Sequence, residues 1–502
     1  MSIPSSASSS RRQMANQSTR RRRTLFSPSL AASLAILLVA SCSRSLVAAR
    51  KQSTSSDSSG PSDSDPGIYP GGKDGFTDGW SVLPNVTGAR LDMAGLRVGD
   101  DAAAQSADSS DGAITTTTTP MLPYYITDKY DSNTIKRAVI QIHGDNRDAW
   151  NQWLYADLAL DRAVQGGTVK REEVAIMAPQ FLTTIDYLAY GAISEAVAPA
   201  SSLMVWNATA DDWGDGFPPI FPARSTVGAF DALDSALDFF LDRQTFPNLV
   251  TVVLAGFSMG GQLVQRYAMF RNEADQEDEE RIHYWIGAPA SFVYLNDSRP
   301  ETVRRCKDFN EYKYGLEGTL PPYLDGRPKA EDLGPRYVSR RTNYLVGTRD
   351  KIDGDPRCEA DAQGRTHLNK TRFWVEDVVP YLPGAPGNGQ LPVNSTIDYV
   401  SKVSHQDWRV IASDAGVQRL FLDDYSAIAP AAGDQSTSAR APPSNGDGNV
   451  SPTDIDNGKA DDDGDGKKNN GAGRSARNSS LRLMLSIAST SALLCVATQM
   501  VL

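Results

Sequence analysis

The stretch that most constrains the fold is "LVTVVLAGFSMGGQLVQRYAMF", residues 249–270. It opens with an apolar run rich in β-branched residues, 249–254, which is typical of a strand buried on both faces. A helical pattern begins near Gly261, and Gly256-Phe257-Ser258-Met259-Gly260 connects the two. A chain that turns this sharply needs a strained backbone at Ser258 and no side chains two residues before and after it, which glycine allows.

This strand, turn and helix also have a chemical consequence. The turn lifts the hydroxyl of Ser258 off the sheet edge, and it places the N–H group of Met259 at a helix N-terminus, where it can hold a developing negative oxygen. The pattern Gly-X-Ser-X-Gly also occurs by chance, so the strand before it and the helix after it carry the interpretation. We predict that Ser258 is a nucleophile and that Met259 supplies one backbone donor of an oxyanion hole.

Strand and helix patterns alternate along the rest of the folded part. Apolar runs predict strands at 138–142, 174–178, 283–289, 343–348 and 396–403, and periodic segments predict helices at 227–244, 263–270 and near 368–382. This alternation favours an α/β fold with a mostly parallel central sheet and helices on both faces. The folded domain is predicted over 68–426, with a polar low-complexity insertion at 100–119.

With these motifs the chain resembles the α/β-hydrolase superfamily, of the serine esterase and lipase kind, over about residues 68–426. "IQIHGDNRDAW" at 140–150 is similar to the His-Gly turn that follows the third strand in that family. The resemblance implies that the backbone N–H of Asp145, or otherwise that of Asn146, is the second oxyanion donor. His143 then shapes the loop, and its ring is not expected to take part in the chemistry.

The resemblance also implies catalytic partners in the order serine, acid, histidine, because a serine hydroxyl needs a base that a carboxylate orients. His405 in "KVSHQDW" lies just past a predicted strand, where the family has its base. Asp350 in "YLVGTRDKIDGD" matches the family spacing from the strand end, and Asp353 is the alternative acid. Of the other histidines, His283 opens a strand and is expected to be structural, while His367 starts a helix before a sequon and is expected to be exposed.

Both ends of the chain have the composition of targeting signals. Arg20 to Arg23 precede a short apolar run, which predicts a secretory signal peptide over 1–45, with an uncleaved anchor or a bacterial lipoprotein signal as alternatives. Polar low-complexity segments predict a disordered linker at 46–67 and a disordered stalk at 427–473. The apolar end within 474–502 predicts a glycolipid (GPI) attachment signal, or otherwise a C-terminal hydrophobic anchor.

Sequons and cysteines in the folded part fit a secreted protein. Five sequons for N-glycosylation start at Asn85, Asn207, Asn296, Asn369 and Asn394. Two of the four cysteines, Cys306 and Cys358, lie outside the end segments, so we predict that they pair in a disulfide in an oxidising compartment. The segment "CEADAQG" at 358–364 also resembles a group of secreted eukaryotic α/β-hydrolases.

Charge and motifs together define the function that we predict. The formal net charge of −11 excludes a nucleic-acid partner, because phosphate binding needs a basic surface. The motifs predict a serine hydrolase at the outer cell surface that cleaves a carboxylic ester through an acyl-enzyme, with no cofactor and no metal. The expected substrate is a small-molecule, lipid or plant-wall ester, a peptide bond is also left open, and the oligomeric state is open. The alternative is an inactive binding or adhesion protein on the same fold.

Overall fold

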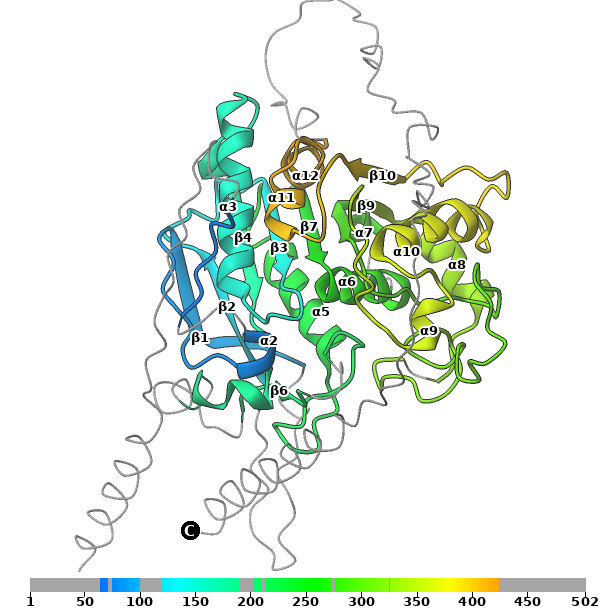
Figure 1. Ribbon diagram of the computed structural model, residues 1–502. Coiled ribbons are helices and arrows are strands. Elements are labelled where there is room, and N and C mark those ends of the chain that lie inside the picture. Colours follow the sequence, from blue (N-terminus) through cyan, green and yellow to red (C-terminus); the bar gives the residue numbers. More distant parts are fainter. Residues whose placement is uncertain are drawn as a thin grey trace, which may run out of the picture. The chain divides into compact units, whose positions relative to one another are not determined.

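The computed structural model describes residues 64–70, 75–99, 119–189, 191, 202–208, 213–272, 276–324 and 326–424 (Figure 1). The predicted signal peptide, most of the linker, all but the last residue of the insertion, the stalk and the C-terminal signal lie outside these residues. None of the helices in the described part combines the length and the apolar character that crossing a membrane requires.

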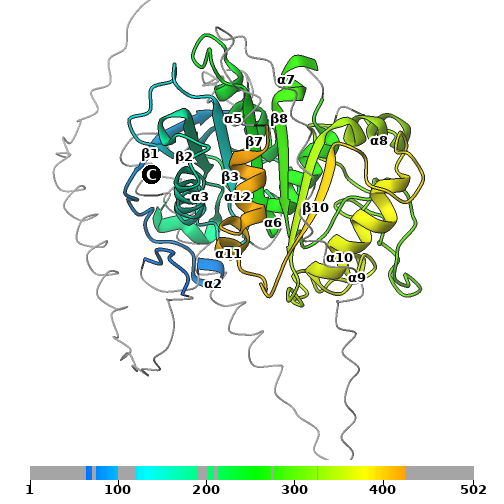
Figure 2. The same cartoon turned by 90° about the horizontal axis from the view of Figure 1, so that it is seen from above.

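An eight-stranded sheet forms the centre of the fold, in the order β1-β2-β4-β3-β7-β8-β9-β10. Its strands are β1 (Ala89–Arg97), β2 (Met121–Thr127), β3 (Arg137–Ile142), β4 (Val174–Pro179), β7 (Thr251–Phe257), β8 (Ile282–Gly287), β9 (Arg341–Gly347) and β10 (Ser395–Val400). The β1–β2 and β2–β4 pairs are antiparallel, and every other pair in this sheet is parallel. The predicted mostly parallel sheet is therefore confirmed (Figures 1 and 2).

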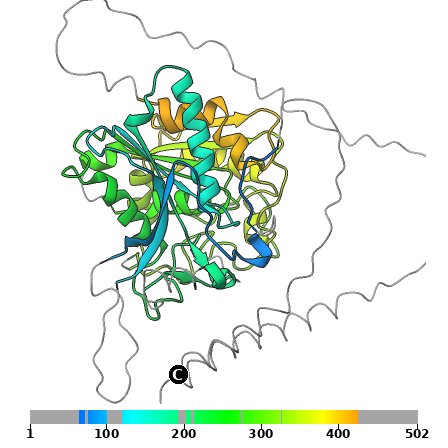
Figure 3. The same ribbon diagram turned by 90° about the vertical axis from the view of Figure 1, so that its left-hand side faces the viewer.

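Helices cover both faces of the sheet. The described helices are α2 (Gly75–Asp78), α3 (Ala149–Gln165), α5 (Ala229–Leu241), α6 (Met259–Phe270), α7 (Gln276–Arg281), α8 (Ala330–Ser339), α9 (Cys358–Asp361), α10 (His367–Phe373), α11 (Asp407–Ile411) and α12 (Asp414–Val417). One apolar cluster joins the sheet to α5, α6 and α8, and a second joins its other face to α3, α11 and α12. Figure 3 shows these layers on opposite sides of the strands.

Strand β7 separates the two apolar clusters. Val252 and Leu254 belong to one cluster, and Val253 and Ala255 belong to the other, because successive side chains point to opposite faces of a strand. This strand extends to Phe257, three residues beyond the apolar run 249–254 from which it was predicted. The reason is tertiary: the parallel ladder with β8 continues to the very end of β7, where Phe257 pairs with Gly287.

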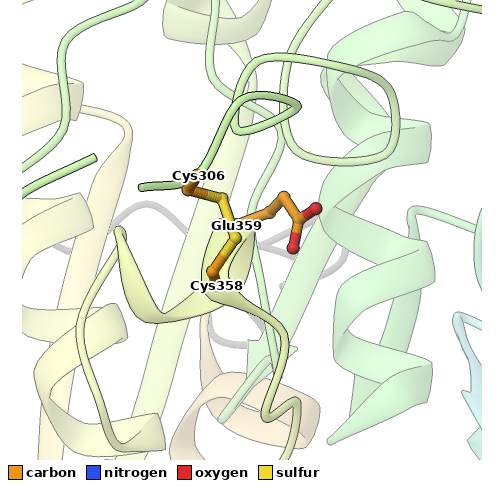
Figure 4. Close-up of side chains that lie close together, drawn as sticks. All are labelled: Cys306, Cys358 and Glu359. Atoms are coloured by element: carbon orange, nitrogen blue, oxygen red, sulfur yellow. A yellow bond between two sulfur atoms is a disulfide. The ribbon is translucent and has the colours of Figure 1, made fainter. Parts of the chain in front are cut away.

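The predicted disulfide between Cys306 and Cys358 is present, with 5.7 Å between the two Cα atoms (Figure 4). It joins the long connection between β8 and α8 to the first residue of α9. Glu359 lies beside the bridge on α9. A separate pair of short parallel strands, β5 (Leu182–Thr183) and β6 (Val205–Trp206), lies outside the central sheet.

Candidate active site

Ser258 lies between the end of β7 and the start of α6, in an unusual backbone conformation. Its φ of 58° and ψ of −121° are rare for any residue other than glycine. The N–H of Ser258 donates to the carbonyl oxygen of Gly287 at 2.8 Å, and its carbonyl oxygen accepts the N–H of Gln262 at 2.9 Å. The strained turn is thus held by the next strand on one side and by the first turn of α6 on the other, and the serine side chain stays partly exposed.

The glycines around Ser258 are required by close approach of backbone. A β-carbon on Gly256 would lie 2.4 Å from the carbonyl carbon of Gly260. One on Gly260 would lie 2.5 Å from the carbonyl oxygen of His143, and one on Gly261 would lie 2.4 Å from that of Gly287. Any side chain at these three positions would push the ends of β3, β7 and β8 apart. This is the steric role that the sequence predicts for glycines two residues before and after the serine.

The His-Gly turn after β3 lies against the serine. A β-carbon placed on Gly144 would be 3.6 Å from the β-carbon of Ser258 and 3.5 Å from the carbonyl oxygen of Phe257. Asp145 and Asn146 follow in an exposed turn, which the N–H of Arg147 closes by donating to the carbonyl oxygen of Gly144 at 3.1 Å. The backbone that carries the two alternative oxyanion donors is therefore next to Ser258, and Met259 begins α6 on the other side.

A buried ion pair anchors this turn. The guanidinium of Arg147 contacts Asp186 at 2.8 Å, and the two side chains are only 4% and 0% exposed. Asp186 also accepts the backbone N–H of Trp80 at 2.9 Å, while the indole N–H of Trp80 donates to the carbonyl oxygen of Asn146 at 2.6 Å. Breaking one partner of a buried pair leaves an uncompensated charge, so this group holds the turn in one shape. Neither Arg147 nor Asp186 is predicted from the sequence, because their contact joins positions 39 residues apart.

Asp350 and His405 meet at the carboxyl ends of β9 and β10. Nδ1 of His405 lies 2.7 Å from Oδ2 of Asp350, so this nitrogen donates its proton and leaves Nε2 to accept one. Asp350 is completely buried, whereas the His405 side chain is 18% exposed. The ring of His405 packs on Phe257, the residue before Ser258, with 4.8 Å between ring centroids. The three elements that carry the predicted triad thus converge at one edge of the sheet.

The alternative acid, Asp353, has another partner. Its carboxylate is 3.3 Å from Nζ of Lys370 and its side chain is 45% exposed. The hydrogen bond to His405 belongs to Asp350. The geometry therefore favours Asp350 over Asp353 as the residue that orients the base.

Two of the remaining histidines are buried and neutral. Nδ1 of His143 lies 2.8 Å from the carbonyl oxygen of Gly144, and Nε2 accepts the N–H of Phe181 at 3.0 Å. Burial lowers the pKa of His143 to about 4, so its ring supports the turn after β3 as an uncharged group. Burial in β8 also lowers the pKa of His283 far below its usual value.

His367 is not exposed, so that prediction is wrong. The residue is 1% exposed and its ring stacks on the ring of His405, with centroids 4.0 Å apart. The start of α10 packs beneath the loop that carries Asp350, since the N–H of Leu368 donates to the carbonyl oxygen of Asp350 at 3.2 Å. The stack of His367 on His405 cannot be predicted from a local sequence pattern, because it joins the start of a helix to a loop 38 residues further along the chain.

The predicted glycosylation sites differ in exposure. Asn85, Asn296 and Asn394 are exposed, whereas Asn207 and Asn369 are partly buried. Thr371, which completes the sequon of Asn369, is completely buried within α10. Modification of the five asparagines stays a prediction.

Two groups of described side chains bring possible metal ligands within 4.8 Å of one another. In the first group, Cys306 and Cys358 are already joined in the disulfide beside Glu359. The second group is Asp350, His367 and His405, in which Asp350 and His405 already share a hydrogen bond.

These features define the class of protein. The sheet order, the strained serine between β7 and α6, the acid after β9 and the histidine after β10 are the α/β-hydrolase arrangement. The chain has the α/β-hydrolase fold.

Comparison with known proteins gives the following matches. No protein family and no curated protein matches the sequence. Among solved structures, the chain is similar to LpqC, a poly(3-hydroxybutyrate) depolymerase from Bordetella parapertussis, with 16% identity, a TM-score of 0.37 and coverage of 61% of this chain and 88% of that one. It is similar to poly(aspartic acid) hydrolase-1 from Sphingomonas sp. KT-1, with 16% identity, a TM-score of 0.38 and coverage of 64% and 96%. It is also similar to the ferulic acid esterase AmCE1/Fae1A from Anaeromyces mucronatus, with 14% identity, a TM-score of 0.30 and coverage of 66% and 99%.

Proposed function

We propose that this protein is a serine hydrolase that cleaves carboxylic esters through an acyl-enzyme. The observation that carries the proposal is the 2.7 Å hydrogen bond between Asp350 and His405 at the same sheet edge as the strained serine. A buried carboxylate bonded to Nδ1 selects the tautomer whose Nε2 accepts a proton, which is the form a general base needs. A binding protein without catalysis has no need of this pairing.

The reaction proceeds in two halves. Nε2 of His405 takes the proton of Ser258 as its hydroxyl oxygen attacks the ester carbonyl, and Asp350 stabilises the imidazolium that forms. The tetrahedral oxygen is held by the backbone N–H groups of Met259 and Asp145, or Asn146 in its place, each contributing about 10²–10³ in rate. Collapse releases the alcohol with the proton from His405. Water then attacks the acyl-enzyme by the same route and frees the acid and the serine.

Location at the outer cell surface is part of the proposal. The predicted N-terminal secretory signal, the sequons in the folded domain and the predicted C-terminal lipid anchor or hydrophobic tail support it. The disulfide between Cys306 and Cys358 is in keeping with an oxidising compartment. The substrate is a small-molecule, lipid or wall ester that reaches the protein from outside the cell.

Fluorophosphonate labelling tests the mechanism. We expect the wild-type protein to be labelled and to hydrolyse a chain-length series of nitrophenyl esters, and we expect Ser258→Ala to lose both, with kcat lower by about 10⁶. Ser235→Ala is the matched control, because its hydroxyl donates to the carbonyl oxygen of Asp231 within α5. Absent labelling of the wild type, or labelling that persists in Ser258→Ala, would favour an inactive binding or adhesion protein.

Release from cells tests the anchor. Phosphatidylinositol phospholipase C is expected to free the protein from the surface of expressing cells if the C-terminus carries a glycolipid. If the protein stays on the cells after treatment, we would infer that a hydrophobic tail and not a glycolipid anchors it.

A further inference from the structure

The imidazole of His405 lies against a second imidazole, that of His367. The ring centroids are 4.0 Å apart and the planes differ by only 18°, which is a stacked arrangement. His367 is the first residue of α10 and is 1% exposed, so solvent does not separate the two rings. Nothing in the two-step ester mechanism uses this second ring.

Two hydrogen bonds and the space left by a glycine fix the position of His367. Its Nδ1 lies 3.1 Å from the carbonyl oxygen of Pro289, so this nitrogen carries the proton and donates it. Its backbone N–H donates to the carbonyl oxygen of Ile352 at 3.0 Å, within the loop that begins at Asp350. A β-carbon on Gly354 would lie 2.3 Å from Nε2 of His367, so glycine leaves the room that this ring occupies. His367 is therefore held against the same loop that carries Asp350.

The geometry of the pair suits stacking and does not suit a shared metal ion. Although ligand atoms of Asp350, His367 and His405 lie within 4.8 Å of one another, a histidine binds a metal along a lone pair in its ring plane, at about 2.0–2.1 Å. Two nearly parallel rings at 4.0 Å direct such lone pairs side by side and not toward one point. The Nδ1 atoms are also already used, on Asp350 and on Pro289.

The charge of the pair is asymmetric. Burial, followed by the nearby charge of His405, lowers the pKa of His367 well below its usual value. His367 therefore stays neutral when His405 becomes an imidazolium. The face of a neutral aromatic ring is negative, so it favours a cation stacked on it.

We propose that His367 is a positioning residue for the base: its neutral ring stacks on His405, holds the imidazole in line between Asp350 and Ser258, and stabilises the imidazolium. This inference rests on the proposed function. His367 does not touch the substrate and accepts no proton in the reaction. Its effect belongs to the step in which His405 is charged, so it acts on kcat and not on substrate binding.

Two substitutions separate the stack from the hydrogen bond to Pro289. His367→Asn keeps a donor near the position of Nδ1 and removes the ring, whereas His367→Phe keeps a stacking ring and removes the donor. With nitrophenyl esters we expect kcat of the asparagine variant to fall about tenfold with KM nearly unchanged, and kcat of the phenylalanine variant to stay within about threefold of wild type. Thermal unfolding is recorded for both, because phenylalanine adds an atom against Gly354.

Two outcomes of these kinetic measurements would overturn the proposal. Full kcat in a folded asparagine variant, or an equal loss in both variants, means that the ring does not support the base. A second measurement is the low-field proton resonance of Nδ1–H on His405, which we expect to be sharp in wild type and broadened in His367→Asn. If phenylalanine prevents folding, an unchanged resonance and unchanged kcat in the asparagine variant overturn the inference. If the wild-type protein is neither labelled nor hydrolytic, the proposed function is wrong. The Nδ1–H resonance of His405 in wild type and in His367→Asn then still tests whether His367 positions this ring.

Discussion

At the scale of single residues, two aspartates three positions apart have different environments. Asp350 is completely buried and bonded to His405, while Asp353 is partly exposed and paired with Lys370. A carboxylate can orient an imidazole only when its oxygen lies within hydrogen-bond distance of Nδ1. Burial of Asp350 also excludes the water that would compete for that nitrogen.

The two aspartates give a matched pair of variants. Asp350→Asn is expected to lower kcat by about 10⁴, because an amide at this position favours the wrong tautomer of His405. Asp353→Asn is expected to change kcat little, since the carboxylate of Asp353 contacts the buried ammonium group of Lys370 and not His405. Steady-state kinetics with a nitrophenyl ester and thermal unfolding of both variants check this. Equal losses of kcat would remove Asp350 from its assigned role.

Another buried aspartate, Asp148, is expected to make the stability of the protein depend on pH. Asp148 precedes α3 and is 2% exposed, and its Oδ1 is one of the buried atoms in the described part that have no hydrogen-bond partner. Burial and the nearby charge of Asp407 raise the pKa of Asp148 to about 8. In the unfolded chain the pKa returns to about 3.9.

The folded protein therefore binds more protons than the unfolded chain between these two pKa values. By proton linkage, the free energy of unfolding falls as the pH rises from about 4 to about 8. Asp148→Asn is expected to reduce this fall, so that its melting temperatures at pH 5 and pH 8.5 lie closer together than those of wild type. Asp414→Asn, whose side chain is 96% exposed, is the control and should follow wild type. An identical pH dependence in Asp148→Asn and wild type would contradict the assignment.

At the scale of elements, the connection from β7 to α6 is the tightest part of the fold. Backbone from the ends of β3, β7 and β8 approaches within contact of its glycines, and Ser258 takes a left-handed φ between them. The strain at Ser258 persists because these neighbours leave no room for relaxation. The position of Ser258 thus depends on three strands and one helix, and not on the turn alone.

Alanine substitution at these glycines is expected to disturb both stability and the site. Gly256→Ala and Gly260→Ala place a β-carbon 2.4 Å and 2.5 Å from backbone atoms, and we expect each to lower the free energy of unfolding by about 2 kcal/mol or more and to abolish labelling. Gly191→Ala is the control, because in the described part of the chain no atom beyond its own chain neighbours lies within 4 Å of an added β-carbon. Urea unfolding and fluorophosphonate labelling measure the two effects. Wild-type stability in Gly256→Ala or Gly260→Ala would show that the turn is looser than its contacts imply.

At the scale of the molecule, the disulfide links two long connections that carry no strand. The segment between β8 and α8 contains Cys306, and the loop that begins at Asp350 ends at Cys358 on α9. The side chains of Tyr314 and Asp355 add a hydrogen bond of 2.8 Å between the same two connections. The loop that carries the acid is thereby tied to the rest of the domain.

Removal of the bridge is expected to destabilise the whole domain. The bond closes a loop with a sequence separation of 52, for which the chain-entropy model gives about 4 kcal/mol. Cys306→Ser with Cys358→Ser should lower the free energy of unfolding in urea by roughly this amount, and reduction of wild type should have the same effect. An unchanged urea midpoint in the double variant would mean that the noncovalent contacts alone hold these connections.

Local patterns in the sequence were sufficient for much of the fold. The strands β3, β4, β7, β8, β9 and β10 and the helices α5 and α6 lie at or near their predicted ranges. The antiparallel strand β2 was not predicted, because "MLPYYIT" contains Pro123, which lacks a backbone donor. Helix α3 was not predicted either; its Trp150, Trp153 and Tyr155 are buried in the core.

The sequence by itself determined the order of the elements, the glycine turn around Ser258 and the disulfide partners. Hydrophobic periodicity and steric limits act over short stretches of chain, and only two cysteines lie outside the end segments. Tertiary structure alone decided that Asp350 and not Asp353 contacts His405, that Arg147 and Asp186 anchor the turn after β3, and that His367 is buried against His405. Ring stacks and ion pairs depend on which side chains meet in space, and folding brings these residues together from positions 38 to 55 apart along the chain.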